Sequence, residues 1–334
     1  MQDQARLGGS RTTVVVLVPE DEGMPPGLDA LGSSADVRLA QTDGELGEVI
    51  GEAEVLCVWD FRRPRLARFW ADAVQLKWVH ASSAGVDAVL FDELVDSDVV
   101  VTNTRGVLDD SIAEYVLGAI LAFTKDVPAT IRLQQQRRWR HRDTERAAGR
   151  RVLVLGAGSI GRAVGRLCRC AGMVVEGLGS RPRPGDEVFE QVVGPDGLDD
   201  ALSRADFVVA CLPLTAQTRG LIGPEEFGAM PRGSRFINVA RGPVVDEGAL
   251  VAALESGHLA GAALDVFEQE PLPEDHPFWK MEQVMVTAHQ AGDFVGWEEA
   301  FSAMFMENFR RFVSGEPLDN VVDKRRMVPP AEKV

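Results

Sequence analysis

The sequence predicts an α/β protein with two doubly wound parallel sheets. Three observations carry this prediction. Short β-branched runs alternate with helical segments over the first hundred residues. A strand, a glycine turn, a helix and a second strand follow one another over residues 151–178, and further strand-like runs continue to residue 288. A chain of 334 residues is long enough for two domains that each bury a core.

Individual elements follow from periodicity. Strands are expected at residues 12–18, 53–59, 76–81, 99–103, 151–155, 173–178, 205–212, 234–240, 261–267 and 283–288. Helices are expected after the glycine turn and at residues 65–73, 109–125, 245–257 and 301–312. Asp109, Asp110 and Ser111 supply N-cap chemistry for the helix at 109–125, which is expected to cross between the domains. The chain ends, 1–10 and 320–334, are expected to be polar tails.

The amino-acid composition limits the binding partners and the cellular compartment that we expect. With 35 basic and 51 acidic residues, the net charge of −16 argues against nucleic acid or an anionic membrane as the main partner. No run reaches membrane-spanning length, and the N-terminus lacks a signal-peptide pattern. We therefore expect a cytoplasmic protein whose cysteines are buried free thiols, at positions Cys57, Cys168, Cys170 and Cys211.

One segment departs from the acidic balance. Residues 132–151 are strongly basic and contain Trp139. A run of like charges is usually a solvated face, but in so acidic a chain it is also a candidate subunit contact with Trp139 as its anchor. The sequence leaves both interpretations open.

The glycine turn at residues 156–161 reads GAGSIG and fits the pattern G-x-G-x-x-G. Gly156 allows a tight turn, Gly158 lets the backbone approach a pyrophosphate, and Gly161 lets the helix pack closely on the strand. The N-terminus of the following helix offers N–H groups to the phosphates. In its setting of strand, helix and strand, this motif predicts a dinucleotide site.

Three polar residues follow predicted strands of the second half. They are Arg241, Glu270 and His289, and the carboxyl ends of parallel strands bring them to the same sheet edge as the glycine turn. Such a set suits the reduction of a carbonyl beside a carboxylate. Arg binds the anion and polarises the carbonyl oxygen, His transfers the proton, and the carboxylate orients the imidazole and raises its pKa. Taken singly, each residue is open to a structural interpretation, and Arg241 has a candidate salt-bridge partner in Asp246.

A second turn of small residues follows the predicted strand at 76–81. Residues 82–87 read SSAGVD. Small residues at a strand end let backbone N–H groups face an anion, but the same stretch fits an ordinary turn into a helix. From the residues alone, the two interpretations weigh equally.

Five stretches carry a family resemblance. The chain resembles the D-isomer-specific 2-hydroxyacid dehydrogenases, including glyoxylate/hydroxypyruvate reductases, over nearly its whole length. The stretches are GAGSIG, CLPLT at 211–215, FINVARG at 236–242, ALDVFEQEPL at 263–272 and TAHQAG at 287–292. The resemblance implies that Arg241 binds and polarises the substrate, that His289 is the general acid/base, and that Glu270 is its partner. It also implies that Asp265 lies near the nicotinamide carboxamide.

The resemblance further implies a two-domain architecture. A flavodoxin-like substrate domain would comprise residues 1–104 and 293–334, and a Rossmann cofactor domain, residues 105–292, would be inserted into it. The backbone of Ala84 and Gly85 would bind the substrate carboxylate. Family members are typically dimers through the cofactor domain, so a homodimer is expected, with a small 2-keto or 2-hydroxy acid as the ligand and no metal.

The sequence departs from the family at the place of the acidic residue that usually binds the ribose of NAD. Gly179 stands there, Glu176 falls mid-strand, and Ser180, Arg181 and Arg183 follow, a set that favours a 2′-phosphate. We therefore expect NADP(H) to be preferred, with NAD(H) possible. The whole cofactor set is expected to comprise Gly156, Gly158, Ser159, Ile160, Gly161, Ser180, Arg181, Arg183, Leu212, Pro213, Thr218, Ala240, Asp265, His289 and Gly292.

These observations predict the NAD(P)H-dependent reduction of a 2-keto acid to a D-2-hydroxy acid. Two alternative functions occur among related proteins. Formate dehydrogenases carry Gln at the place of Glu270, which argues against that activity, and a dinucleotide-sensing corepressor of the same fold remains as an alternative. The sequence does not indicate which side chain the substrate carries. The candidates for lining its pocket are Phe61, Arg62, Trp139, Phe294 and Trp297, together with Trp59, which we expect to be core.

Overall fold

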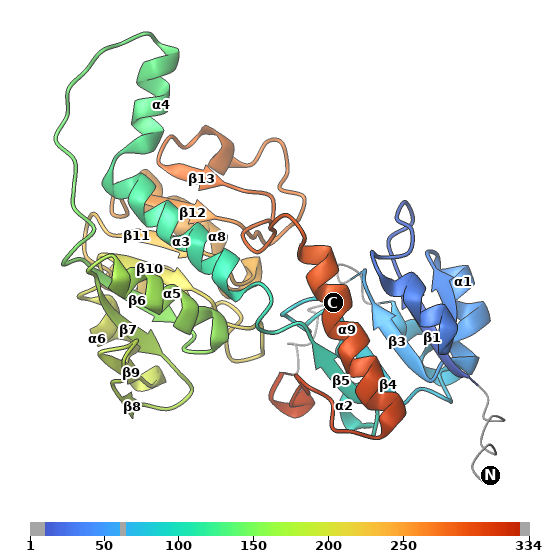
Figure 1. The fold of residues 1–334 in the computed structure, drawn as a ribbon. Coiled ribbons are helices and arrows are strands. Elements are labelled where there is room, and N and C mark those ends of the chain that lie inside the picture. The colour runs from blue at the N-terminus through green and yellow to red at the C-terminus, as the bar shows by residue number, and fades with distance from the viewer. Residues whose placement is uncertain (1–10, 61–64, 328–334) are drawn as a thin grey trace, which may run out of the picture. The chain divides into compact units, whose positions relative to one another are not determined.

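The computed structural model describes residues 11–60 and 65–327 (Figure 1). Its contacts divide the chain into two compact units. The chain passes from the first unit to the second after Val107 and returns after Phe294. The first unit therefore combines the two ends of the sequence, and the second is inserted between them. In the part of the chain that is described, we find no helix with the length and apolar character that a membrane span requires.

The first unit is built on a five-stranded sheet in the order β2-β1-β3-β4-β5, with every pair parallel. This is the flavodoxin-like order, and it confirms one of the two predicted sheets. Its strands are β1 (Thr12–Leu17), β2 (Ala35–Ala40), β3 (Val55–Val58), β4 (Trp78–Ala81) and β5 (Val100–Asn103). Its helices are α1 (Asp43–Val49), α2 (Asp92–Asp96) and α9 (Trp297–Ser314).

Alternate residues of β4 show how this sheet is covered. Val79 joins the apolar cluster to which α1 and α2 contribute. Trp78 and His80 point the other way and contact Phe305 of α9, with the Trp78 and Phe305 ring centroids 5.2 Å apart. Because both faces are covered, all four residues of β4 are buried.

Some elements of the first unit differ from the prediction. Strand β2 and helix α1 were not predicted, and residues 65–73 contain a 3₁₀ helix, Leu66–Asp72, in place of an α-helix. The C-terminal segment is not the polar tail that the sequence suggested. Val321 bridges Thr102, and Lys324 Nζ donates hydrogen bonds of 2.7–2.9 Å to three carbonyls, those of Leu94, Ser97 and Val99.

The second unit is built on an eight-stranded sheet in the order β13-β12-β11-β10-β6-β7-β9-β8, parallel except for β8. Strands β9-β7-β6-β10-β11-β12 reproduce the Rossmann order 3-2-1-4-5-6, which confirms the second predicted sheet. The strands are β6 (Arg151–Leu155), β7 (Val174–Leu178), β8 (Arg183–Pro184), β9 (Gln191–Val193), β10 (Phe207–Ala210), β11 (Arg235–Asn238), β12 (Gly261–Leu264) and β13 (Val284–Val286). The helices are α3 (Asp109–Thr124), α4 (Val127–Gln135), α5 (Ser159–Cys170), α6 (Leu198–Leu202), α7 (Pro224–Ala229) and α8 (Glu247–Glu255).

The central strand β6 is buried on both faces. Val152 belongs to the apolar cluster that α3 and α5 cover, and Leu153 belongs to the cluster on the other face, which includes residues of α6, α7 and α8. The two clusters hold the sheet between layers of helices. The parallel strands therefore end at one rigid edge, where the candidate site residues follow.

Three features of the second unit correct the prediction. Helix α3 begins at Asp109 as predicted, but its N-cap is Leu108, and Asp109 and Asp110 lie in the first turn, where negative charge favours the helix dipole. The helix lies within the second unit and does not cross between units. All four cysteines are free as expected, but Cys170 is exposed and only Cys57 and Cys168 are fully buried.

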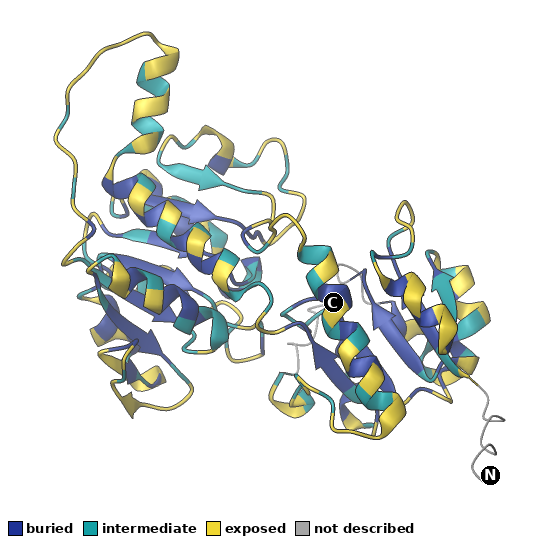
Figure 2. Cartoon of the chain, viewed as in Figure 1, coloured by how far each residue is buried: buried dark blue, intermediate teal, exposed yellow. Residues whose placement is uncertain are grey.

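Helix α4 stands out from the body of the second unit (Figure 1). Each of its residues is exposed or half-exposed, and the loop that follows is exposed almost throughout (Figure 2). This loop carries Trp139, whose side chain is fully exposed, and Ile131 on α4 is half-exposed. Several arginines of this basic segment have local partners, such as Arg142 with Asp126 at 2.8 Å.

Candidate active site

The three predicted catalytic residues follow adjacent parallel strands. Arg241 follows β11, Glu270 follows β12 and His289 follows β13. Glu270 and His289 are in direct contact, with Glu270 Oε2 2.7 Å from His289 Nδ1. Since Nδ1 faces the carboxylate, Nε2 of His289 is the atom available for proton transfer.

The carboxylate of Glu270 is held from two sides. Its Oε1 accepts a hydrogen bond of 2.9 Å from the backbone N–H of Phe267, and Oε2 meets His289. Burial opposes ionisation of this carboxyl. The bonds from His289 and Phe267, with the charges of His289 and Arg241, outweigh burial and lower the pKa of Glu270 below its ordinary value. A carboxylate ionised at neutral pH is suited to stabilise an imidazolium.

Asp265 organises the loop that carries His289. It is 2% exposed, and its backbone carbonyl accepts the N–H of His289 at 2.8 Å. Its carboxylate accepts the N–H groups of Gln290 and Ala291, each at 2.9 Å. These bonds hold His289 at φ +52°, a left-handed conformation that costs a non-glycine residue on the order of 1 kcal/mol. The nicotinamide contact that the resemblance gives Asp265 stays a prediction.

A chain of hydroxyl groups extends this network to α3. Thr287 Oγ1 donates to Asp265 Oδ1 at 2.6 Å, and the Tyr115 hydroxyl lies 2.9 Å from Thr287 Oγ1. Because the Thr287 proton is used by Asp265, Tyr115 is the donor in the second bond. Burial raises the pKa of Tyr115 to about 12, so its hydroxyl stays protonated.

Arg241 lies in a turn that packs tightly on the segment before Glu270. Asn238 at the end of β11 orders this turn, since its Oδ1 accepts the N–H of Ala240 at 3.0 Å. A Cβ at Gly242 would overlap the backbone of Phe267, so only glycine allows this approach. The Arg241 guanidinium donates to the Ala240 carbonyl at 2.8 Å. The carboxylate of Asp246, the alternative partner suggested for Arg241, caps α8 through the N–H of Ala249.

The glycine turn has the geometry that a dinucleotide requires. Gly156 follows β6 with φ +109°, and a Cβ at Gly161 would overlap the Gly156 carbonyl oxygen. At Gly158, a Cβ would meet none of the described residues within 4 Å, so the space above this backbone is open. Ser159 and Ile160 begin α5, and its N-cap, Gly158, has no side-chain capping bond. Open space at a helix N-terminus fits a pyrophosphate.

The segment after β7 bears on the choice of nucleotide. Glu176 is not a candidate for binding ribose, because it lies within β7, is buried, and forms hydrogen bonds of 2.6–3.0 Å with three side chains, those of Arg151, Arg204 and Gln191. Arg183 is paired with Asp186 at 2.7 Å. Arg181 is exposed and has no ion pair with any residue that the structure describes.

The other expected cofactor residues surround the same sheet edge. Leu212 and Pro213 follow β10, and Thr218 stabilises their loop by donating to the Pro213 carbonyl at 2.6 Å. Ala240 belongs to the Arg241 turn, and Gly292 lies against Leu108, two residues beyond Gln290. Their contacts with a nucleotide stay predictions. In the described ranges, no group of three or more His, Cys, Asp or Glu residues is arranged to hold a metal.

The first unit holds the predicted carboxylate-binding turn. The carbonyl of Ala84 accepts Asn103 Nδ2 at 2.7 Å, and the carbonyl of Gly85 accepts Ser83 Oγ at 2.5 Å. In the described ranges, no hydrogen bond satisfies the backbone N–H groups of Ala84 and Gly85. An anion would satisfy them.

The residues suggested for the substrate pocket divide into two groups. Trp59 is core, as expected, since it is 4% exposed and stacks on Trp297 at 6.1 Å. Phe294 and Trp139 are exposed. Phe61 and Arg62 lie outside the described residues.

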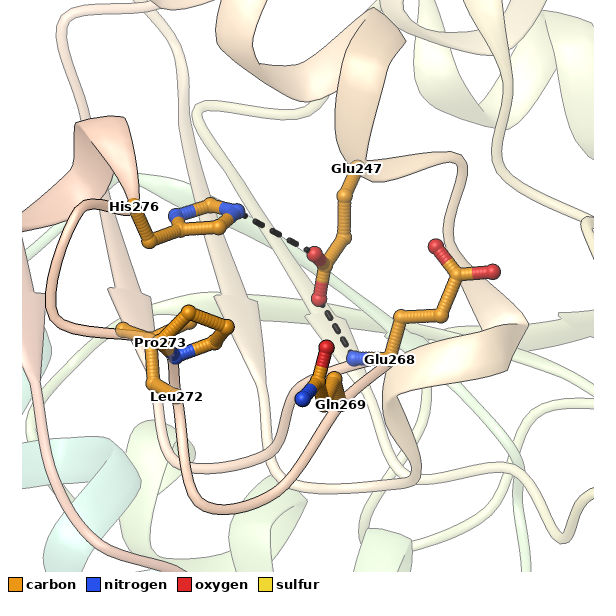
Figure 3. Close-up of a pocket in the computed structure, with 6 residues that line it drawn as sticks. All are labelled: Glu247, Glu268, Gln269, Leu272, Pro273 and His276. Atoms are coloured by element: carbon orange, nitrogen blue, oxygen red, sulfur yellow. Dashed lines mark hydrogen bonds and ion pairs between the residues drawn. The ribbon is translucent and has the colours of Figure 1, made fainter.

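Several residues of the site were not predicted from the sequence. Asn238 and Thr287 lie within two of the family motifs, but nothing in the neighbouring residues indicates the buried hydrogen bonds that they form. Tyr115 lies far from the site in the sequence. Glu247 and His276 line a pocket beside Glu270, with Glu268, Gln269, Leu272 and Pro273 (Figure 3).

Comparison with known proteins shows which proteins the chain resembles. The family described as D-isomer specific 2-hydroxyacid dehydrogenase, NAD binding domain, matches residues 117–291. D-3-phosphoglycerate dehydrogenase of Methanocaldococcus jannaschii is 31% identical over 327 residues, which are 96% of this chain. The chain spans only 61% of the length of that relative.

Two solved structures extend the similarity to the fold. A D-isomer specific 2-hydroxyacid dehydrogenase from Xanthobacter autotrophicus Py2, in complex with NADPH and MES, is 37% identical with a TM-score of 0.79, covering 95% of this chain and 100% of that one. An NADPH-dependent glyoxylate/hydroxypyruvate reductase from Sinorhizobium meliloti, in complex with NADP and sulfate, is 29% identical with a TM-score of 0.80, covering 94% and 99%. With a family match over more than half of its length, the chain belongs to the D-isomer specific 2-hydroxyacid dehydrogenase family.

Proposed function

We propose that the protein reduces a 2-keto acid to a D-2-hydroxy acid, reversibly, with a nicotinamide dinucleotide as the hydride donor. The observation that carries the proposal is the contact between His289 and Glu270, with the charge of Arg241 acting on the same carboxylate. Family membership supports it, because the similar proteins are named as dehydrogenases and reductases of this kind.

Each residue of the site has a separate role in the proposed reaction. The glycine turn at residues 156–161 would hold a nicotinamide dinucleotide, which would supply the hydride when bound. Arg241 binds the substrate carboxylate and polarises the keto oxygen, and His289 delivers a proton to that oxygen. Glu270 orients the imidazole through its contact with Nδ1. In the first unit, the N–H groups of Ala84 and Gly85 are suited to bind a carboxylate.

A substrate panel tests the proposal. Purified protein is mixed with glyoxylate, hydroxypyruvate or phenylpyruvate and with NADPH or NADH, and cofactor oxidation is followed together with the chirality of the product. We propose that glyoxylate and hydroxypyruvate are the better substrates, by analogy with the reductase from Sinorhizobium meliloti. If no 2-keto acid is reduced with either cofactor, the proposal is wrong, and a binding role like that of a corepressor takes its place.

We expect NADPH to be the preferred cofactor, with Arg181 as the main reason. Arg183 already pairs with Asp186, whereas Arg181 is exposed and adjoins Ser180 at the end of β7. Replacing Arg181 by alanine should lower kcat/KM for NADPH roughly tenfold, the value of one charge-assisted hydrogen bond, and leave that for NADH nearly unchanged. Arg183→Ala is the matched control and should have a smaller effect. A wild-type kcat/KM that favours NADH would contradict the expectation.

We also propose a homodimer in which α4 and the loop after it contact the second copy. Trp139 is fully exposed on this segment, and an exposed tryptophan is a typical interface anchor. Trp139→Ala should weaken the dimer by about 2 kcal/mol or more, which is about 30-fold in the dissociation constant. Sedimentation equilibrium measures it, with Trp279→Ala, another exposed tryptophan of the second unit, as the control. A wild-type protein that stays monomeric at micromolar concentration would refute the proposal.

A further inference from the structure

A carboxylate outside the predicted catalytic set bonds to the turn that carries Glu270. Glu247 is the first residue of α8. Its Oε1 accepts the backbone N–H of Glu268 at 2.5 Å, and its Oε2 lies 3.5 Å from His276 Nε2 (Figure 3). The side chain of Glu247 is only 15% exposed. A carboxylate so placed forms part of a structured contact and is not an ordinary surface charge.

The bond from Glu247 lies directly beside the bond that fixes Glu270. The N–H of Phe267 is bound by Glu270 Oε1 at 2.9 Å, and the next N–H along the chain, that of Glu268, is bound by Glu247. Two consecutive N–H groups are thus each held by a carboxylate. The orientation of this peptide pair determines where the carboxylate of Glu270 meets His289.

Glu247 also belongs to the chain segment that begins with Arg241. Five residues separate the two, and near the start of this segment Gly242 packs directly on the backbone of Phe267. The segment 241–247 therefore contacts the turn before Glu270 at both of its ends, through Gly242 and through Glu247. The two contacts together fix the spacing between the Arg241 segment and the Glu270 turn.

We infer that Glu247 is a positioning residue for the reaction, which it serves by fixing the Glu270 turn against the Arg241 segment. This inference rests on the proposed reductase function. Without the carboxylate, the N–H of Glu268 loses its acceptor and the turn is held at one end only. Catalysis depends steeply on such placement, since an error of about 1 Å is worth up to roughly 100-fold in rate.

The test compares three variants in glyoxylate reduction with NADPH. Glu247→Ala removes the acceptor and should lower kcat by roughly 10- to 100-fold, with the KM for NADPH within about twofold of wild type. Glu247→Gln keeps a carbonyl acceptor for Glu268 and should recover most of the loss. Glu274→Gln removes an exposed carboxylate of the same loop and should leave kcat unchanged.

A double-mutant cycle identifies the route of the effect. If Glu247 acts through Glu270, then Glu247→Ala should cost much less in a Glu270→Gln background than alone, because neighbours in one network are not additive. Multiplicative losses, an unchanged kcat, or a fall in kcat matched by an equal rise in the KM for NADPH would overturn the inference. If Glu247→Ala does not fold, Glu247→Asp, which keeps the charge and shortens the reach, should show the fall in kcat.

The inference and the function that it rests on fail in different ways. A wild-type protein that reduces no 2-keto acid with either cofactor refutes the proposed function. An active wild type together with an unimpaired Glu247→Ala variant refutes only the role of Glu247.

Discussion

Replacing His289 by alanine should lower kcat for 2-keto acid reduction by about a thousandfold, with little change in the KM for the cofactor. The imidazole is held by Glu270 at 2.7 Å, and the backbone N–H of His289 donates to the Asp265 carbonyl, so Nε2 has a fixed direction. A proton delivered from a fixed donor stabilises the transition state more than the ground state. Single-turnover measurements with saturating NADPH separate this loss from any change in product release.

Two further variants sharpen this prediction. Glu270→Gln keeps a hydrogen-bond acceptor for His289 but removes the charge, so its loss of kcat should be smaller than that of His289→Ala. His258→Ala is the matched control, because His258 bonds to the Met230 carbonyl at 2.9 Å and belongs to neither catalytic segment. Turnover of His289→Ala within about tenfold of wild type would show that another group supplies the proton.

The sequence was sufficient to predict the strands that are buried on both faces. Strand β6 has the predicted bounds, because the four consecutive apolar residues of Val152–Leu155 mark a central parallel strand. Strand β2 was missed for the opposite reason. It lies at the sheet edge, four of its six residues are half-exposed, and Asp36 and Arg38 interrupt its apolar pattern. Edge strands lack the continuous apolar signal on which such a prediction depends.

Long-range contacts explain the error at the C-terminal end. Residues beyond 320 look like a polar tail, because Asn320, Asp323 and Lys324 carry no periodic pattern. In the fold, Lys324 reaches carbonyls that precede it by more than 200 residues. A cation that binds main-chain carbonyls leaves no trace in the sequence around it.

In the candidate site, too, local patterns could be predicted from the sequence and long-range contacts could not. Arg241, Glu270 and His289 became candidates because each follows a strand whose carboxyl end lies at one sheet edge, and the family resemblance gave them their expected roles. The bonds that hold them were not predicted. Asp265, expected near the nicotinamide, uses its carboxylate on backbone N–H groups, and Glu247, which was not predicted, does the same from the first turn of α8. Pairings between a side chain and a distant backbone group depend on loop geometry, which residue type and spacing do not determine.

Replacing Arg241 by lysine should lower kcat/KM for 2-keto acids by about 100- to 1,000-fold. Lysine keeps the positive charge but lacks the planar, forked donors that match a carboxylate and its neighbouring carbonyl oxygen. The turn itself should survive, because Asn238 bonds to the N–H of Ala240 and Gly242 packs on Phe267 independently of the side chain at position 241. Steady-state kinetics with glyoxylate measures the loss, and Arg169→Lys, an exposed arginine of α5, is the matched control.

Chemical rescue separates the geometry of Arg241 from its charge. If the guanidinium group itself polarises the keto oxygen, then added guanidinium ion at millimolar concentration should restore part of the activity of Arg241→Ala, and ammonium ion should restore less, because only the former offers two parallel donors. Cofactor affinity should be the same in Arg241→Ala and in wild type. Equal rescue by both ions would mean that position 241 supplies only positive charge, and near-normal activity of Arg241→Lys would lead to the same conclusion.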